Sequence, residues 1–327
     1  MKTSVIIPYY NPSGDQELNN LLVRAIRSAS DNLESVCDHE ILVVNDGSPS
    51  APVLDSVHDI SAVRYIYRSH GMLGAARNTG ILNATGSIIT FLDADDCFFP
   101  GALAPCIRKM EESGADLLGF GIERIMAGKT IPAFSSNAPV FDAPVTGEEY
   151  MRTHNLFGSS CRYLISSKFI ESNGLRFMEN AFIEDEEFTT RMMFLSQRYI
   201  DTRFPVYAYC IRKGSIITDL SSTKTNAKSA DTIKALSSLV NFRAQHQSEP
   251  HQGLDRKINW LALDHLRRTL RRKDWKDAIP VQTKALKSLG LFPLPSRDRS
   301  FKFRLFSRLS GCKAGLYLLH FAEKKLL

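Results

Sequence analysis

The interpretation of the whole chain depends on one stretch, Ile88-Ile89-Thr90-Phe91-Leu92-Asp93-Ala94-Asp95-Asp96. Its first half is short, β-branched and aromatic, and it lies between Gly86 and Pro100, a pattern typical of a buried strand. Three carboxylates then follow within four residues. Because aspartate is a poor strand residue, we expect this acidic cluster where the strand ends.

The acidic cluster has two interpretations. Neighbouring carboxylates repel one another unless a cation or hydrogen-bond donors balance them. Hard cations such as Mg²⁺ and Mn²⁺ take oxygen ligands and are commonly shared between carboxylates and substrate phosphates. Taken alone, however, so short a pattern is more often a solvated acidic turn that caps the next helix. The other motifs of the chain have to decide between the two.

The size and composition are those of a globular protein. The 327 residues suit one large domain or two ordinary ones, and 43% of them are hydrophobic and 23% charged. No apolar stretch approaches the ~20 residues of a membrane-spanning helix. The N-terminus runs at once into a strand-like segment ending at Pro8, so we expect no signal peptide. The six cysteines lack Cys-x-x-Cys spacing, which favours free thiols in a reducing, cytoplasmic compartment.

Charge is distributed unevenly along the chain. Residues 1–220 contain 19 Lys and Arg against 27 Asp and Glu, whereas residues 221–327 contain 22 against 8. The two parts are therefore expected to face different partners, the acidic part a cation and the basic part an anionic surface.

Strands and helices alternate in the first hundred residues, and this spacing implies βαβ units and an open parallel sheet. Ligands of such sheets bind at the carboxyl ends of the strands. We therefore expect the loops that follow three of the strands to line one crevice: Pro8-Tyr9-Tyr10-Asn11, Asn45-Asp46-Gly47-Ser48 and Asp93-Ala94-Asp95-Asp96. The glycine-rich phosphate loops Gly-x-Gly-x-x-Gly and Gly-x-x-x-x-Gly-Lys-Ser/Thr are absent, so phosphate would be held by metal and basic side chains.

A second acidic run, Glu184-Asp185-Glu186-Glu187, begins a segment with helical spacing. Such a run usually marks a solvated helix N-terminus, which the helix dipole favours. The flanking Phe182, Ile183 and Phe188 would instead draw it toward the protein body. Further on, Arg212 beside a Gly-Ser turn could hold a diphosphate, although basic residues in a turn are more often solvated.

Five short motifs together resemble family 2 glycosyltransferases of the GT-A fold. In chain order they are Pro8-x-Tyr10-Asn11, Val43-Val44-Asn45-Asp46-Gly47-Ser48, Ala76-Arg77-Asn78-x-Gly80, Phe91-Leu92-Asp93-Ala94-Asp95-Asp96 and Glu184-Asp185-x-x-Phe188. The resemblance implies an α/β fold with a mostly parallel central sheet flanked by helices. It implies a catalytic domain over residues 1–220, with a donor half of about 1–100 and an acceptor half of about 101–220. A basic helical C-terminal region would follow over residues 221–327.

The same resemblance implies an inverting, metal-assisted transfer of one hexose from a nucleotide-diphosphate sugar, UDP-linked, to a hydroxyl of a saccharide or lipid-linked saccharide. The donor would contact Pro8, Tyr10, Asn11, Asp46, Arg77, Asp93 and Arg212. Asp95, with Asp93, would hold Mn²⁺ or Mg²⁺, and Asp185 would be the general base. The Gln-x-x-Arg-Trp signature of processive synthases is absent, which favours addition of a single sugar. The alternative is a non-catalytic module that binds nucleotide sugar and recruits partners.

One feature departs from the family pattern. The family usually shows Asn-x-Gly ahead of the Ala-Arg-Asn run, and here Ser69-His70-Gly71-Met72 stands in that place. His70 is a candidate to replace the missing asparagine.

The basic third of the chain has helical composition over residues 224–247, 254–273 and 300–327, with breaks expected at Pro250, Pro280, Pro293 and Pro295. It lacks the interleaved aromatics and motifs of a nucleic-acid-binding surface. Its last segment alternates apolar and basic residues at three- and four-residue steps. It is expected either to pack on the catalytic domain or to lie on an anionic membrane, at the inner face of the cell membrane.

Overall fold

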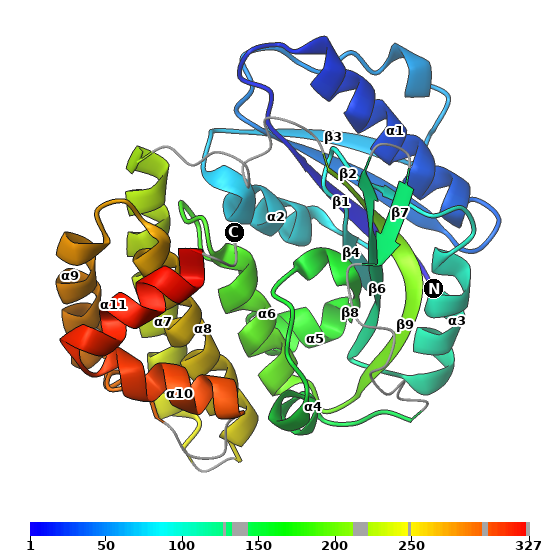
Figure 1. Ribbon diagram of the computed structural model, residues 1–327. Coiled ribbons are helices and arrows are strands. Elements are labelled where there is room, and N and C mark those ends of the chain that lie inside the picture. The colour runs from blue at the N-terminus through cyan, green and yellow to red at the C-terminus, as the bar shows by residue number, and fades with distance from the viewer. Residues whose placement is uncertain (127–128, 133–142, 212–221, 248–249, 296–299, 325–327) are drawn as a thin grey trace. The chain divides into compact units, whose positions relative to one another are not determined.

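A computed structural model describes residues 1–126, 129–132, 143–211, 222–247, 250–295 and 300–324 (Figure 1). The chain forms two compact units. The first comprises Met1–Tyr150 and Phe157–Leu220, and the second comprises Met151–Leu156 and Ser221–Leu327. Each unit has buried apolar side chains of its own.

Within the residues that the structure describes, a nine-stranded sheet forms the centre of the first unit, in the order β3-β2-β1-β4-β8-β6-β9-β5, with β7 paired to β6. The first four of these strands are parallel to one another, as the alternating pattern predicts. Beyond them, β6 and β9 are parallel, and the other pairs are antiparallel. The strands are β1 Thr3–Tyr9, β2 His39–Asp46, β3 Val63–Arg68, β4 Ile88–Phe91, β5 Cys97–Phe98, β6 Leu117–Met126, β7 Lys129–Pro132, β8 Tyr163–Ser166 and β9 Tyr199–Cys210.

Helices cover both faces of this sheet (Figure 1). The chain moves outward from β1 to β3 and then returns to the other side of β1 as β4, so right-handed crossovers place α1 (Gln16–Leu33) and α2 (Met72–Asn83) on opposite faces. Helix α1 begins where the Asp15 side chain accepts a hydrogen bond from the Glu17 N–H. The remaining helical segments up to β9 are η1 Asp55–Val57, α3 Leu103–Ser113, α4 Gly147–Thr153, η2 Ser160–Arg162, α5 Ser167–Ser172 and α6 Glu184–Leu195.

A glycine lets α2 approach the sheet closely. A Cβ atom on Gly80 would lie 2.3 Å from the Cγ2 atom of Ile6 in β1, closer than packed carbon atoms allow. Arg77 is three residues earlier on the same face of the helix, and its side chain is fully buried. The close approach thus carries a guanidinium into the interior of the unit.

The loops at the carboxyl ends of the parallel strands meet at one edge of the sheet, as the sequence predicts. Pro8 in β1 pairs with Val44 in β2, so both strands end together. Beyond these ends, the Asn11 N–H donates a hydrogen bond of 2.9 Å to the Ser48 hydroxyl. The loop after β4 leaves the same edge, because β4 is parallel to β1.

The second unit is helical, as expected of the C-terminal region. Helix α8 contacts α7, α9 and α11, and α10 contacts α11. Among the residues that the structure describes, no helix is long and apolar enough to cross a membrane. The helices are α7 Ser222–Gln245, α8 Gln252–Arg271, α9 Trp275–Ser288, α10 Phe301–Ser310 and α11 Lys313–Lys324.

Two details of this region differ from the sequence prediction. Pro280 lies inside α9 and does not end a helix, so the break predicted there is wrong. The proline removes one backbone hydrogen bond, but the burial of Trp275, Ile279 and Leu286 on the same helix offsets that cost. The segment from residue 300 onward forms two helices, separated around Gly311.

Candidate active site

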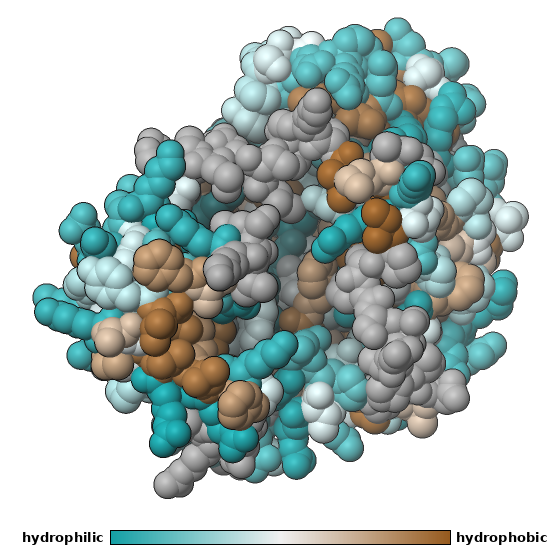
Figure 2. All heavy atoms as spheres, in the orientation of Figure 1, coloured by the Kyte–Doolittle hydropathy of each residue, from teal (hydrophilic) through white to brown (hydrophobic). Residues whose placement is uncertain are grey.

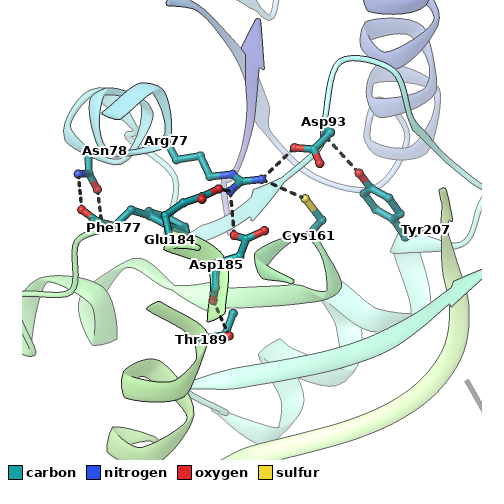
Figure 3. Close-up of polar contacts among 9 residues, drawn as sticks. All are labelled: Arg77, Asn78, Asp93, Cys161, Phe177, Glu184, Asp185, Thr189 and Tyr207. Carbon is teal, nitrogen blue, oxygen red and sulfur yellow. Dashed lines mark hydrogen bonds and ion pairs between the residues drawn. The ribbon is translucent and has the colours of Figure 1, made fainter. Parts of the chain in front are cut away.

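A single buried guanidinium joins three carboxylates (Figure 3). Arg77 donates from Nη2 to Asp93 Oδ1 at 2.9 Å. Its Nη1 donates to Asp185 Oδ1 at 2.8 Å and to Glu184 Oε1 at 3.1 Å. The arginine comes from α2, Asp93 from the loop after β4, and the two other acids from the first turn of α6. Residues more than one hundred positions apart in sequence therefore meet at one side chain.

Aromatic packing fixes the position of the α6 acids. Phe188, one turn into the helix, is fully buried and stacks on Phe177 with ring centroids 3.8 Å apart. The Arg77 guanidinium lies 5.4 Å from the centroid of the same Phe177 ring, which adds a cation–π contact. The apolar residues flanking the acidic run thus draw it into the protein body, and a fully solvated helix start does not describe it.

The charges in this cluster do not balance, because three carboxylates share one arginine. Burial, and then the neighbouring Asp185, raise the pKa of Glu184 to about 7. Burial also raises the pKa of Asp185, and the positive charge of Arg77 opposes that shift. About one quarter of the Asp185 side chain remains exposed, against 6% for Glu184. Both acids are therefore harder to ionise than free carboxyl groups, and of the two Asp185 is the one that faces the solvent.

A tyrosine that no motif marked supports the acidic loop. Tyr207 in β9 donates a hydrogen bond of 2.6 Å to Asp96 Oδ2 and accepts one of 3.2 Å from the Asp93 N–H. The Cys210 N–H donates to the other oxygen of Asp96 at 2.7 Å. Burial, followed by Asp93 and Asp95, raises the pKa of Asp96 to about 9. Asp96 therefore ties the loop to β9, and Asp93 and Asp95 are left as the candidates for ligand contact.

A second cluster surrounds Asp46 at the end of β2. Its carboxylate is almost wholly buried, accepts a hydrogen bond of 3.0 Å from the Gly71 N–H, and pairs with Arg68. The His70 Nδ1 atom lies 2.9 Å from Asp46 Oδ2, and the His70 ring stacks on Tyr10 with centroids 4.3 Å apart. His70 thus contacts both the ring of Tyr10 and the carboxylate of Asp46, two residues that the family resemblance assigns to the donor.

The other predicted donor residues have different placements. Pro8 is buried within β1. The Asn11 side chain shapes the turn before α1: its Nδ2 donates to the Asp15 carbonyl and the Tyr9 hydroxyl, and its Oδ1 accepts from the Asp15 N–H. Arg77 is fully buried, and its guanidinium contacts the carboxylates of Asp93, Glu184 and Asp185. Arg212 lies outside the described residues.

The loop after β4 suits a hard cation in the chemistry of its donors. About one third of the Asp93 side chain is exposed, and Asp95 follows two residues later, so both can offer carboxylate oxygens. Within the described ranges, no group of three or more His, Cys, Asp or Glu side chains is placed to hold a metal ion. A cation bound here would therefore need further oxygen ligands besides these two carboxylates.

The chain is similar in sequence to known glycosyltransferases. The family model "Glycosyl transferase family 2" matches residues 4–169. The glycosyltransferase GlyA of Streptococcus pneumoniae serotype 4 is 28% identical over 229 residues, which cover 66% of this chain and 31% of that protein. The succinoglycan biosynthesis protein ExoW of Rhizobium meliloti is 27% identical over 189 residues, covering 52% of this chain and 56% of that protein. The chain thus matches less than two thirds of the length of these relatives.

Solved structures share the fold. Residues 1–349 of Staphylococcus aureus TarS, in complex with UDP-GlcNAc, align with a TM-score of 0.68 and 17% identity, covering 100% of this chain and 91% of that one. The mannosyltransferase PcManGT of Pyrobaculum calidifontis, in complex with GDP-Man and Mn²⁺, aligns with a TM-score of 0.53 and 14% identity, covering 98% and 86%. The GT-A fold expected from the sequence motifs is confirmed.

Proposed function

The chain belongs to glycosyl transferase family 2, and we propose that it is an inverting enzyme acting on a nucleotide-diphosphate sugar. It moves one sugar from a UDP-linked donor to a hydroxyl of a saccharide or lipid-linked saccharide. The carrying observation is that Arg77 joins Asp93, the predicted donor residue, to Asp185, the predicted base. Because the two acids bind different nitrogens of one guanidinium, donor and acceptor ends are held at a fixed spacing.

The donor base would lie on the exposed ring of Tyr10, in the place that His70 occupies in this structure. Movement of His70 would also open access to the Asp46 carboxylate, which can accept a hydrogen bond from the N–H of uracil. Asp93 and Asp95 would hold a divalent cation together with the diphosphate. Such a cation offsets the charge that builds on the leaving nucleoside diphosphate.

Asp185 would take the proton from the acceptor hydroxyl as that oxygen attacks the anomeric carbon. A base needs to be ionised and within hydrogen-bond reach of ~2.6–3.2 Å from the hydroxyl. Burial raises the pKa of Asp185, which suits it to accept a proton, and the positive charge of Arg77 limits that rise. Glu184 can hold the proton that three crowded carboxylates require. When Asp185 becomes protonated, Arg77 keeps Asp93 and Glu184 as partners, so no buried charge is left unpaired.

The base is tested with Asp185→Asn. This variant should bind UDP-GlcNAc as the wild type does, and transfer should fall by about 10²–10⁴, the usual contribution of general-base catalysis. Glu186→Gln, the adjacent acid on α6, is the matched control and should keep its transfer rate. Undiminished transfer by Asp185→Asn would remove this residue as the base. Donor binding by the wild type with every acceptor left unmodified would favour the non-catalytic module instead.

The cation is tested by calorimetry of UDP-GlcNAc binding with and without Mn²⁺. We expect the wild type to bind more tightly with Mn²⁺, and Asp95→Ala to lose that gain while retaining the metal-free affinity. Equal affinity of the wild type under both conditions would rule out a cation bridge to the diphosphate.

Helix α10 could also bring the enzyme to a membrane surface. Phe301 and Leu305 are exposed to 70% and 46%, and the cationic Lys302, Arg304 and Arg308 are exposed beside them. An apolar ridge flanked by cations suits a peripheral contact with an anionic bilayer at the inner face of the cell membrane, where a lipid-linked acceptor would be presented. Flotation with phosphatidylglycerol vesicles should weaken for the Phe301→Ser, Leu305→Ser double variant. It should not change for Val281→Ser, an exposed control on α9. Unchanged flotation of the double variant would exclude this surface.

A further inference from the structure

An open basin of about 400 Å³ lies in the second unit, between the start of α9 and helix α11. Its volume is in the range of small-molecule sites, roughly 300–1,000 Å³. Trp275 from α9 lines it on one side, and Tyr317, His320 and Phe321 from α11 line it on the other. None of the family motifs falls in this part of the chain, and the proposed transfer reaction uses none of these residues.

The floor of the basin is rigid. Trp275 stacks on His320 with centroids 4.5 Å apart and an interplanar angle of 20°. The edge of Tyr317 meets Trp275 at 5.0 Å and 83°. His320 is buried, and its Nδ1 donates to the Leu270 carbonyl at 2.6 Å, which fixes the ring from behind. The aromatic rings are therefore held in place before any ligand arrives, and such preorganisation lowers the entropic cost of binding.

The rim exposes large apolar side chains to solvent. Phe321 is 63% exposed and Tyr317 is 46% exposed. On the left of the face in Figure 2, hydrophobic residues gather over the position that α11 has in Figure 1. An aromatic surface left in contact with water around a concave site marks a place where a ligand binds.

The polar residues at the rim narrow the class of ligand. The Lys276 ammonium lies 5.4 Å from the centre of the Tyr317 ring. Lys273 also lines the basin, and it is exposed, as are Asp274 and Asp277 on the same turn of chain. Asp274 pairs with Arg272 at 2.7 Å. Two lysines and two aspartates leave the lining without a net charge that would favour an ionic ligand, whereas an uncharged ligand rich in hydroxyls can hydrogen-bond to both the acids and the lysines.

We propose that this basin binds a pyranose ring of a neutral saccharide, as a site separate from the transfer chemistry. The C–H face of the ring would lie on Tyr317 and Phe321, whose π-electrons attract weakly positive hydrogens. Lys276 and Asp277 would hydrogen-bond to its hydroxyl groups. The inference rests on the proposed function only in taking the acceptor as the source of the saccharide, because binding itself requires no transfer.

The test is a titration of the full chain, without nucleotide, followed by ligand-observed saturation-transfer NMR. The probes are three neutral hexasaccharides: maltohexaose, cellohexaose and chitohexaose. We expect at least one to bind, and the Tyr317→Ala, Phe321→Ala double variant to weaken it about tenfold. Tyr317→Phe keeps the ring face and should bind within about twofold of the wild type. Leu318→Ala, 62% exposed on the same helix, is the matched control and should not change the affinity.

Three outcomes would overturn the proposal. They are the binding of no probe by the wild type, an unchanged affinity in the double variant, and loss of phosphatidylglycerol-vesicle binding in that variant with no effect on any saccharide. Failure of the proposed transferase would look different. In that case UDP-GlcNAc binding or transfer would be missing from the wild type while the hexasaccharide titration still depended on Tyr317 and Phe321.

Discussion

Arg77 joins side chains from three parts of the candidate site. Its guanidinium is fully buried and satisfies carboxylates from the acidic loop and from α6, while its Nε atom has no hydrogen-bond partner among the described residues. A buried charge is tolerated only when it is paired, so removing one partner costs more than the pair contributes. Loss of the arginine would leave three carboxylates facing one another.

Arg77→Met should therefore lower the free energy of unfolding by about 3–5 kcal/mol. Arg77→Lys should fall between the wild type and the methionine variant, because an ammonium cannot match the fork of the guanidinium. Urea unfolding measures the stability of both variants. The unfolding midpoint should move to lower urea while the slope of free energy against urea concentration stays unchanged. Arg268→Met removes an i,i+4 ion pair whose arginine is 61% exposed, and it should cost about 1 kcal/mol or less. Equal losses of stability in Arg77→Met and Arg268→Met would contradict this account.

Glu40 makes the stability of the folded chain depend on pH. Its burial opposes ionisation, but hydrogen bonds from Ser4, Thr85 and Arg64 outweigh that effect and lower the pKa of Glu40 to about 2. A carboxylate with a depressed pKa in the folded state contributes stability above its unfolded pKa of 4.5. That contribution is lost as the pH falls from 4.5 toward about 2.

Glu40→Gln should accordingly cost about 1–3 kcal/mol at pH 7, and the difference from the wild type should shrink as the pH falls below 4.5. Urea unfolding at a series of pH values measures this. Glu171→Gln, at an exposed glutamate, should follow the wild type throughout. A difference between Glu40→Gln and the wild type that stayed constant down to pH 2.5 would show that ionisation is not its source.

The strands and helices of the first hundred residues follow from local patterns in the sequence. Helical spacing of apolar residues predicts a helix over 16–32, observed as α1, Gln16–Leu33, and the apolar run 40–44 predicts a strand, which lies within β2, His39–Asp46. The sequence also predicts a helix from Ala75 to Ala84. The observed helix, α2, starts at Met72, three residues earlier, because Gly71 precedes it and gives its N–H to Asp46. The pairings of β8 and β9 could not be predicted, since they depend on contacts between segments far apart in sequence.

The residues of the candidate site also fall into two groups, those that a local motif marks and those that only folding brings together. The acids at 93, 95 and 185 were found because each lies in a short motif next to an apolar run. Tyr207 and His70 gain their roles only when β9 and the loop after β3 fold against the acidic loop and β2. The burial of Arg77 could not be predicted from the sequence, because it depends on the close contact of Gly80 with Ile6.

Pro280 lowers the stability of the helix in which it lies. It occupies an interior position of α9, where a proline lacks one backbone N–H and crowds the carbonyl four residues earlier. Pro280→Ala should raise the stability of the second unit by about 1–2 kcal/mol, less than the full helix cost because proline also restricts the unfolded chain. Thermal unfolding followed by helical circular dichroism measures it. Val281→Ala, at the exposed neighbouring position, should change stability by about 0.5 kcal/mol or less. A destabilised Pro280→Ala would contradict the argument.

The chain combines two units with separate cores and opposite net charge. The residues up to 220 carry an excess of acids, and those after it carry an excess of bases. All the residues proposed to contact the donor belong to the first unit. A donor that binds only a folded unit stabilises that unit by mass action.

Calorimetric unfolding with UDP-GlcNAc and Mn²⁺ should therefore raise the transition of the first unit. At a ligand concentration one hundred times its Kd, the gain is about 2.7 kcal/mol. The transition that Pro280→Ala shifts belongs to the second unit and should keep its position. EDTA in place of Mn²⁺ serves as the control and should remove most of the shift. A donor that moved neither transition would exclude nucleotide-sugar binding.

The shared arginine also limits how such enzymes can be recombined. A chimera that joins residues 1–100 of one relative to residues 101–220 of another takes Arg77 and Asp93 from one parent. It takes Glu184 and Asp185 from the other. The two halves cannot be exchanged independently, because a mismatch at any of these four positions leaves a buried charge without its partner in the hybrid. Exchange of donor or acceptor specificity between relatives should therefore succeed only where the crossover carries all four residues together.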